Sequence, residues 1–265
     1  MRIYISADME GIAGISKWDE TIKGRQDYER YREQMTREVA AACEAAIEAG
    51  ADTILVKDAH EDGKNLLHEL LPRTVKVISG WSNHPYCMVE GLDESFDAAI
   101  FIGYHCGSSS NGSTLSHTLY PDRIRKIIIN GEDADEFLIH AYVCRMLGVP
   151  IAAVSGDGEL MRHVKGFDED IKTIALQEGF GGAMVSIHPD LAIERIRRGV
   201  KKALTEGELK KETQLPEQFE MTIEFKKHED AYKYAFYPKA EQIGEYTIRY
   251  ASDQYMDLLT FMLFL

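Results

Sequence analysis

The sequence predicts a three-layer α/β/α fold in which the central layer is a mostly parallel sheet, with a smaller α+β part at the C-terminal end. One regularity of the sequence predicts this class. Short runs rich in Val and Ile alternate along the chain with longer segments in which apolar residues recur every three or four positions. Strands separated by helices pair in parallel, and the helices then cover both faces of the sheet.

Strands are expected where a short β-branched run ends at a polar or turn residue. The first run leads directly into carboxylates, and the run that ends at residue 102 is closed by Gly103. A further run ends at Asn130-Gly131, a pair that is typical of a tight turn. The strands expected in the first part of the chain are residues 3–7, 53–57, 75–79, 98–102, 126–129 and 151–154.

Two helices are expected between these strands. Apolar residues recur at helical steps over residues 28–47, and Gly50 is placed to stop that helix. Either Asp135 or Asp133 can cap a second helix over residues 136–147. Both segments are long enough to cover a face of the sheet.

The pattern of the sequence changes after Ile187. A basic amphipathic helix is expected over residues 189–204, followed by a polar connector and two strands at residues 221–225 and 246–250. The last helix, residues 253–265, is heavily apolar, which is typical of a core helix or of a subunit contact. The chain therefore ends in a part that differs from the alternating first part.

We place a domain boundary near residue 185. It separates an α/β domain of residues 1–185 from a smaller α+β segment of residues 186–265; the alternative is one continuous domain. Just before the boundary, the segment 179–182 (Gly-Phe-Gly-Gly) has no expected strand directly before it and lacks GxGxxG spacing, so nucleotide binding is not indicated.

The composition excludes several classes of protein. The 265 residues include 30 Lys and Arg against 44 Asp and Glu, a net charge of −14, and 45% of the residues are hydrophobic. This apolar share is ordinary for a globular chain and too high for a disordered one. The acidic field repels phosphates, so we expect no nucleic acid as a partner.

No feature indicates a membrane or an oxidising compartment. No apolar run approaches the roughly 18–20 residues that cross a bilayer. The N-terminus lacks the long apolar stretch of a signal peptide. The four cysteines (Cys43, Cys87, Cys106 and Cys144) stand far apart without a CxxC pair, so neither a zinc ribbon nor a disulfide framework is indicated. We therefore expect a cytoplasmic protein without a membrane partner.

Carboxylates and histidines follow several of the expected strands. In an open α/β sheet, ligands bind outside the carboxyl ends of the strands. Asp8 and Glu10 follow the first strand, and Asp58 and His60 follow the second. The later strand ends add His105, with a Gly- and Ser-rich stretch that leads to His117, and Asp157. The expected sheet thus delivers acidic and imidazole groups to one edge.

Each of these residues alone has an ordinary structural explanation, because Asp after a strand commonly forms a turn or a helix cap. Their combination is different, since turn formation gives no reason to select His twice beside Asp and Glu. Mixed carboxylate and imidazole ligands suit Zn²⁺ or Mn²⁺, whereas a purely structural zinc site favours thiolates. The pattern predicts a metal site.

The roles of Glu136 and His117 stay open at this point. A carboxylate in the first turn of a helix is favoured by the helix dipole without any function, yet it can also aim a ligand. His117 is equally consistent with a general acid or base and with a hydrogen bond inside its loop. No GxSxG elbow is present for a serine nucleophile, and Cys106 beside His105 is discounted because adjacent residues of an extended segment diverge.

Several motifs together resemble the zinc-dependent D-aminopeptidase family, which is also labelled dipeptide transport protein. The resemblance runs in order from residue 1 to at least Asp157, and the opening motif is the most specific. The motifs are Ser6-Ala7-Asp8-Met9-Glu10-Gly11-Ile12, Lys57-Asp58-Ala59-His60, Met88-Val89-Glu90-Gly91-Leu92, Gly103-Tyr104-His105 and Ser116-His117.

The resemblance implies a site and an activity. It implies two zinc ions per subunit, with Asp8 as the bridge and His117 as the catalytic histidine. The remaining ligands that it implies are Glu10, His60, His105 and Glu136, with Asp133 and Asp135 as near alternatives to the last. It further implies release of N-terminal D-amino acids from short peptides and a homo-oligomer, a ring-shaped decamer with active sites facing an inner chamber.

Two other functions compete with this reading. A metal-dependent phosphoesterase could use the same architecture, but the site has no Arg or Lys cluster to hold phosphate oxygens. A non-catalytic peptide-binding protein would match the transport label, but a binder needs no paired metals, and the missing export signal argues against a periplasmic carrier. We therefore expect a metallo-aminopeptidase.

Overall fold

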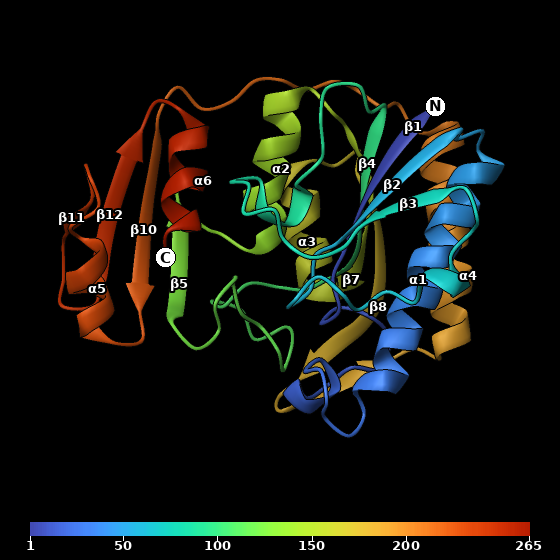
Figure 1. Ribbon diagram of the computed structural model, residues 1–265, viewed down its shortest axis with the longest axis horizontal. Helices are drawn as coiled ribbons and strands as arrows, with labels where there is room; N and C mark the ends of the chain where they lie inside the picture. Colours follow the sequence, from blue (N-terminus) through green and yellow to red (C-terminus); the bar gives the residue numbers. More distant parts are fainter.

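Two β-sheets organise the chain, and the computed structural model describes residues 1–265 throughout (Figure 1). The larger sheet has seven strands in the order β3-β2-β1-β4-β7-β8-β9. Its neighbours pair in parallel except β8 and β9, which form an antiparallel hairpin. The strands are β1 (Arg2–Ala7), β2 (Thr53–Asp58), β3 (Val75–Ile78), β4 (Ala98–Tyr104), β7 (Ile151–Asp157), β8 (Lys172–Phe180) and β9 (Ala183–Ser186).

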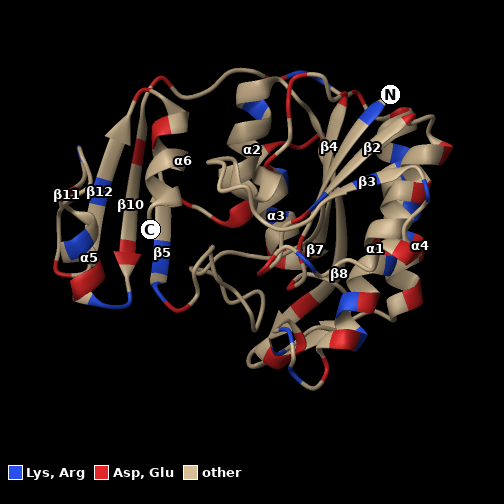
Figure 2. Cartoon of the chain, in the orientation of Figure 1, with Lys and Arg blue, Asp and Glu red and all other residues tan.

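Helices cover both faces of this sheet (Figure 1). On one face, α1 (Tyr28–Glu48) and α4 (Pro189–Glu206) pack together, with Lys, Arg, Asp and Glu along their outer surfaces (Figure 2). On the other face lie α2 (Glu136–Leu147) and α3 (Gly158–Phe167). The predicted three-layer α/β fold is therefore confirmed.

The central strands are apolar on both sides because each face meets helices. Along β1, Ile3 and Ile5 contribute to the core beneath α1 and α4, whereas Tyr4 between them belongs to the core on the α2 side. Side chains of a strand alternate between the two faces, so a strand buried on both faces reads as a continuous apolar run. Every residue of β4 is buried for the same reason.

The smaller sheet has five strands in the order β11-β12-β10-β5-β6, and all its pairs are antiparallel. Its members are β5 (Ile124–Ile129), β6 (Glu132–Asp133), β10 (Phe219–Phe225), β11 (Glu241–Gln242) and β12 (Thr247–Ser252). Two helices accompany it, α5 (His228–Tyr234) and α6 (Tyr255–Leu263). In Figure 1, α6 lies between this sheet and α2.

The strands of the two sheets are interleaved along the sequence. Strands β5 and β6 precede residue 185 but pair within the smaller sheet, whereas α4 follows that residue and packs on the larger one. A positive φ of 51° at Asn130 and of 86° at Gly131 forms the predicted tight turn between β5 and β6. The sheets therefore do not follow a division at residue 185, and that domain boundary stays a prediction.

Several elements differ from those expected. Helices α3 and α5 and the hairpin of β8 and β9 were not predicted, and β8 leads directly into Gly181, so a strand does precede the Gly-rich segment 179–182. The apolar α6 is buried by the chain's own core, with Leu258 and Phe261 fully inaccessible, and so gives no argument for a subunit contact. No helix combines the length and the apolar character that a membrane span requires.

Candidate metal centre

All of the predicted site residues meet at the carboxyl edge of the larger sheet. Parallel strands end at the same edge, so the residues that follow β1, β2 and β4 are brought together there. The first turn of α2 and the loop between β4 and β5 supply the rest. The residues that meet are Asp8, Glu10, His60, His105, His117 and Glu136, and all are buried.

Asp8, Glu10 and His60 form the first of two compact groups. The Nδ1 atom of His60 lies 3.4 Å from Oδ1 of Asp8 and 3.1 Å from Oε2 of Glu10. The opposite ring nitrogen, Nε2, lies 2.8 Å from the carbonyl oxygen of Thr21. A carbonyl oxygen only accepts hydrogen bonds, so Nε2 carries a proton and Nδ1 is the atom presented to the two carboxylates.

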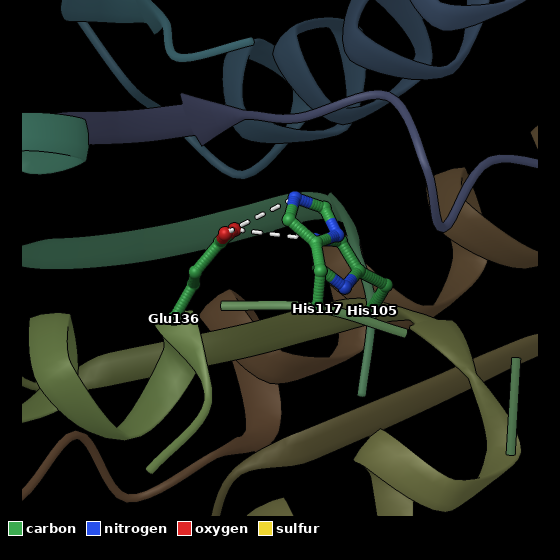
Figure 3. Close-up of side chains that lie close together, drawn as sticks. All are labelled: His105, His117 and Glu136. Atoms are coloured by element: carbon green, nitrogen blue, oxygen red, sulfur yellow. Dashed lines mark ion pairs between the residues drawn. The ribbon is translucent and has the colours of Figure 1, made fainter. Parts of the chain in front are cut away.

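The second group consists of His105, His117 and Glu136 (Figure 3). The Nε2 atom of His105 lies 3.2 Å from Oε2 of Glu136, and that of His117 lies 3.6 Å from Oε1 of the same carboxylate. Asp135 caps α2 by accepting a hydrogen bond from the amide of Leu138, which fixes the helix start that carries Glu136. The cap is therefore Asp135 and not Asp133.

The two histidines of the second group are anchored in the same way as His60. Nδ1 of His105 lies 3.0 Å from the carbonyl oxygen of Cys106, and Nδ1 of His117 lies 2.8 Å from that of Leu115. A histidine that binds a metal almost always donates its other ring N–H to a carbonyl or carboxylate, because this fixes the tautomer and the ring orientation. All three rings therefore present the nitrogen that a metal would bind.

Asp8 connects the two groups. Its Oδ1 faces Nδ1 of His60, and its Oδ2 lies 3.4 Å from Nε2 of His105. The carboxylate follows β1 directly, and the amide of Asp8 donates to the carbonyl oxygen of Ile102 on the neighbouring strand β4, which fixes the backbone from which it projects. One carboxylate oxygen is thus directed to each group.

Burial and close contacts shift the pKa values of these groups in opposite directions. Burial, reinforced by the neighbouring Glu10, raises the pKa of Asp8 well above its ordinary value. Burial opposes the charge on Glu10, but His60 outweighs it and holds the pKa of Glu10 well below its usual range. Burial likewise opposes a proton on His60, but Glu10 and Asp8 raise the pKa of His60 well above normal.

The second group behaves in the same way. Burial opposes ionisation of Glu136, but His105 outweighs it and lowers the pKa of Glu136 to about 2. Glu136 in turn raises the pKa of His105 against the effect of burial. Burial and the adjacent His105 lower the pKa of His117. Buried carboxylates at these distances require positive charge beside them, which either protons or metal ions can supply.

Unsatisfied atoms show that the donor set fits metal ions. Oδ2 of Asp8, Oε2 of Glu10 and Nε2 of His105 are buried and make no hydrogen bond. Buried polar atoms are almost always paired in folded proteins, so such a cluster of unpaired acceptors needs an explanation. Carboxylate oxygens and imidazole nitrogens are ligands for zinc, and their convergence here supplies that explanation.

Asp58 and Asp157 follow strands as well, but neither belongs to the two groups. Asp58 accepts hydrogen bonds from the amides of Asn65 and Leu66 and so fixes the turn after His60. Asp157 caps α3 through the amide of Leu160, and its other oxygen accepts from the amide of Cys106 at 2.7 Å. Both aspartates hold the backbone beside a histidine of the site.

Leu119 contributes to the site in a way that no sequence pattern indicates. Its φ of 61° lies in the left-handed region, which is strained for a residue with a bulky side chain. In this conformation its amide donates to Oε1 of Glu136 at 2.8 Å. The strained residue therefore lies two positions after His117, and its amide satisfies one oxygen of Glu136, the carboxylate that faces His117.

A cavity of about 960 Å³ opens over the two groups. It extends from Asp8 and Glu10 to residues of β5 and α6, so both sheets contribute to its wall. Its only Lys and Arg side chains are Arg125 and Lys226. A cavity of this size beside two sets of metal ligands is the usual form of an enzyme site.

The fold and the site together define a class: an α/β protein with two adjoining carboxylate–histidine groups that suit a metallohydrolase. The chain belongs to the D-aminopeptidase family, whose family model matches residues 1–264. The family predicted from the sequence is therefore confirmed, and with it an enzyme that acts on peptide bonds.

Two relatives resemble the chain over nearly its whole length. The D-aminopeptidase of Bacillus subtilis (strain 168) is 29% identical over 265 residues, which cover 99% of this chain and 96% of the relative. The solved structure described as the zinc-dependent D-aminopeptidase DppA from Bacillus subtilis, a self-compartmentalizing protease, superposes with a TM-score of 0.93 at 28% identity. That match covers 100% of this chain and 96% of the other.

Proposed function

We propose that this protein releases N-terminal D-amino acids from short peptides at a site that holds two zinc ions. The observation that carries the proposal is the placement of Asp8, whose two oxygens face different histidines, His60 and His105. A carboxylate can bridge two metal ions by presenting one oxygen to each. The family and the zinc dependence named for the solved relative support the same reading.

The proposed ligands divide between the two ions. Glu10 and His60 would hold one ion together with Asp8, and His105 and Glu136 would hold the other together with the same carboxylate. His117 is left as the residue that moves protons. Two bound zinc ions would supply polarisation of the scissile carbonyl and a nucleophilic water at neutral pH.

His117 is suited to proton transfer by its anchoring and its charge state. Its Nδ1 is occupied by the carbonyl oxygen of Leu115, so only Nε2 faces the reacting groups. The lowered pKa keeps the ring neutral at pH 7, which allows Nε2 to take a proton and pass it to the leaving amine. Trp18 packs edge-on against the His117 ring, with centroids 5.1 Å apart, and limits its rotation.

The cavity favours a peptide over a phosphoester as substrate. The loop between β4 and β5 has a single basic residue, Arg123, which bonds the carbonyl oxygen of Leu265, and most of this loop is uncharged in Figure 2. Of the two basic side chains that line the cavity, Arg125 is already paired with Glu224 at 3.1 Å. A phosphoryl group would need several cations around its oxygens, whereas a neutral peptide bond does not.

We further propose that the protein works as a homo-oligomer in the cytoplasm, as a ring of ten subunits. The description of the solved relative as self-compartmentalizing supports an assembly of copies. Light scattering at micromolar concentration is expected to give a mass far above the 30.0 kDa of one chain. A monomeric mass would overturn this part of the proposal.

Metal analysis combined with a panel of matched substrates tests the function. D-alanyl and L-alanyl amides, peptides and a phosphomonoester are compared at equal concentration with protein of measured zinc content. We expect hydrolysis of the D-alanyl substrates and little turnover of the others. Equal rates on the D- and L-alanyl amides would refute the stereochemical preference, and phosphoester cleavage alone would favour the phosphoesterase.

A further inference from the structure

A buried ion pair attaches a segment of the cavity wall to the larger sheet, and the proposed mechanism does not use it. Nζ of Lys57 lies 3.2 Å from Oε1 of Glu90, and the side chains of these two residues are 0% and 3% exposed. Lys57 belongs to β2, and Glu90 follows η3 (Cys87–Val89), a short 3₁₀ helix. Both residues belong to motifs noted in the sequence, and neither is a proposed metal ligand.

The ammonium of Lys57 has three acceptors around it. Besides Glu90, Nζ donates to the carbonyl oxygen of Gly80 at 2.6 Å and lies 3.8 Å from the centre of the Trp81 ring. An ammonium carries three N–H groups, and the face of an indole attracts a cation. A buried charge is tolerated when it is paired and hydrogen-bonded in this way. Lys57 is thus bound to both ends of the segment from Gly80 to Glu90.

This 80–90 segment lines the cavity. Six of its residues contribute, namely Trp81, Asn83, His84, Pro85, Cys87 and Met88. Its only regular structure is η3, and Asn83 and Cys87 have positive φ values of 62° and 47°. Backbone in the left-handed region is strained for residues other than glycine and persists only when its surroundings hold it. The shape of this wall therefore depends on bonds to neighbouring parts of the chain.

Glu90 extends the hold of Lys57 along the segment. Its Oε2 accepts hydrogen bonds from the amide of Ser82 at 3.0 Å and from the hydroxyl of Ser82 at 2.5 Å. Lys57 thus bonds Gly80 directly and Ser82 through Glu90. The beginning and the end of the segment therefore meet at one buried ammonium.

The segment also contacts the turn after His60. Nε1 of Trp81 donates to the carbonyl oxygen of Glu61 at 2.7 Å. His60 itself is anchored separately, through the carbonyl oxygen of Thr21. Loosening the segment should therefore move the wall of the cavity more than the proposed ligand.

We propose that Lys57 is a positioning residue for the peptidase: by joining the two ends of the 80–90 segment, it keeps this wall of the cavity in the shape to which the peptide binds. The inference rests on the proposed function, since the substrate is the peptide. A peptide that binds at a fixed wall does not have to order it, whereas a loosened wall must be ordered at each binding event. Bound substrate and transition state need this ordering equally, so its cost affects KM and leaves kcat nearly unchanged.

A double variant tests the role of the pair. Lys57→Met with Glu90→Gln removes both charges at similar volume, and such replacements of a buried ion pair often leave stability unchanged. With D-Ala-Gly as substrate, we expect KM to rise by about tenfold while kcat stays within about twofold. Hydrogen exchange measured by mass spectrometry should become faster at the amides of residues 80–90. Zinc content should equal that of the wild type, because no proposed ligand is changed.

Two further variants complete the design. Lys201→Met with Glu48→Gln makes the same replacements in an ion pair of 2.9 Å between α4 and α1, outside the cavity, and should leave KM and the exchange of residues 80–90 unchanged. Ser82→Ala covers the case in which the first double variant does not fold. It removes one bond between the segment and Glu90, and should raise KM by about two- to threefold.

The outcomes separate the two proposals. Unchanged KM in a folded, zinc-loaded Lys57→Met/Glu90→Gln variant overturns the positioning role and leaves the peptidase function standing. Loss of zinc together with kcat also overturns it, because the pair would then support the ligands and not the wall. Absence of hydrolysis for every D- and L-peptide by zinc-loaded wild type overturns the proposed function, and the positioning role falls with it.

Discussion

The imidazole rings of His105 and His117 are stacked, with centroids 4.3 Å apart and planes inclined by only 10° (Figure 3). Both Nε2 atoms face the carboxylate of Glu136, at 3.2 Å and 3.6 Å. Burial lowers the pKa of His117, and the adjacent His105, which Glu136 favours in its protonated form, lowers that pKa further because two cationic rings at this distance repel each other. The stack therefore gives two similar histidines opposite pKa shifts: the pKa of His105 is raised and that of His117 is lowered.

The first prediction follows from that separation. His117→Ala should keep its zinc and lose turnover by about 10²- to 10⁴-fold, mostly in kcat, because general acid–base help is typically of that size. His60→Ala and His105→Ala should instead lose zinc, since each removes a proposed ligand atom. Zinc content by elemental analysis is compared with kcat for all three variants.

The assignment of His117 has a clear opposite outcome. If His117→Ala loses zinc while adding zinc back restores turnover, the residue is a ligand and not the proton carrier. His228→Ala is a suitable control, because the exposed His228 begins α5 and belongs to neither metal group. That variant should retain both zinc and turnover to a much larger extent.

The second prediction concerns removal of metal. The purified protein should hold close to two zinc ions per chain, and a chelator should lower its melting temperature by roughly 10 °C, as expected for loss of a ligand present at about a thousand times its Kd. The physical reason is that Asp8, Glu10 and Glu136 then lie buried and close together without a cation other than protons. Unchanged melting in the presence of chelator would exclude a zinc-supported fold.

The third prediction concerns Asp157 and its bond to the backbone beside His105. Asp157→Asn can still cap α3 through Oδ1, but its amide group cannot accept from the amide of Cys106. We expect zinc affinity to fall by about 10- to 100-fold, as for other residues that support metal ligands. Titration with a zinc-competing dye measures the change. Asp168→Asn, on the surface after α3, should have no such effect.

The fourth prediction uses the buried Glu38 of α1. Burial raises its pKa to about 7, although it accepts hydrogen bonds from the amide of Ala13 and from Gln34. The pKa of Glu38 is higher in the folded than in the unfolded chain. Below about pH 4.5 Glu38 is protonated in both chains, so its contribution to stability is fully present there. As the pH rises from about 4.5 through about 7, the unfolded chain loses this proton more readily, and stability is lost.

Replacement by glutamine should remove this dependence. Glu38→Gln keeps the acceptor oxygen and carries no charge, so its stability relative to wild type should increase between about pH 4.5 and 7, by an amount on the order of 3 kcal/mol. Urea unfolding at a series of pH values measures the difference. A stability difference that is constant with pH would mean that the pKa of Glu38 is the same in the folded and the unfolded chain.

Much of the site could be predicted from sequence because it depends on strand ends. Parallel topology places the residues after β1, β2 and β4 at one edge, so Asp8, His60 and His105 were recognisable from position and residue type alone. The carbonyl oxygen of Thr21 and the left-handed backbone of Leu119 were not, because any residue carries a carbonyl and leucine gives no signal for a positive φ.

The fold was predictable to the extent that pairing is local. A strand at residues 126–129 was expected, and it forms the second part of β5 (Ile124–Ile129). One partner of β5 is β10, and no periodicity indicates a pairing between segments so far apart in the chain. Helix α3 was missed although Asp157 is its cap, because that aspartate was considered only as a strand-end residue. Local sequence patterns do not encode long-range strand pairing, and they do not reveal that one residue, such as Asp157, can both end a strand and cap a helix.

The interleaving of the two sheets has a consequence for the timing of synthesis. In β5, Ile127 pairs with Ile223 of β10, and the α6 side chains that close the cavity belong to the last residues of the chain. A nascent chain that has already made every proposed zinc ligand, from Asp8 to Glu136, therefore still lacks a wall of its cavity. The cavity can therefore close only after the segment of α6 has been made and has packed against α2, well after the proposed ligands themselves.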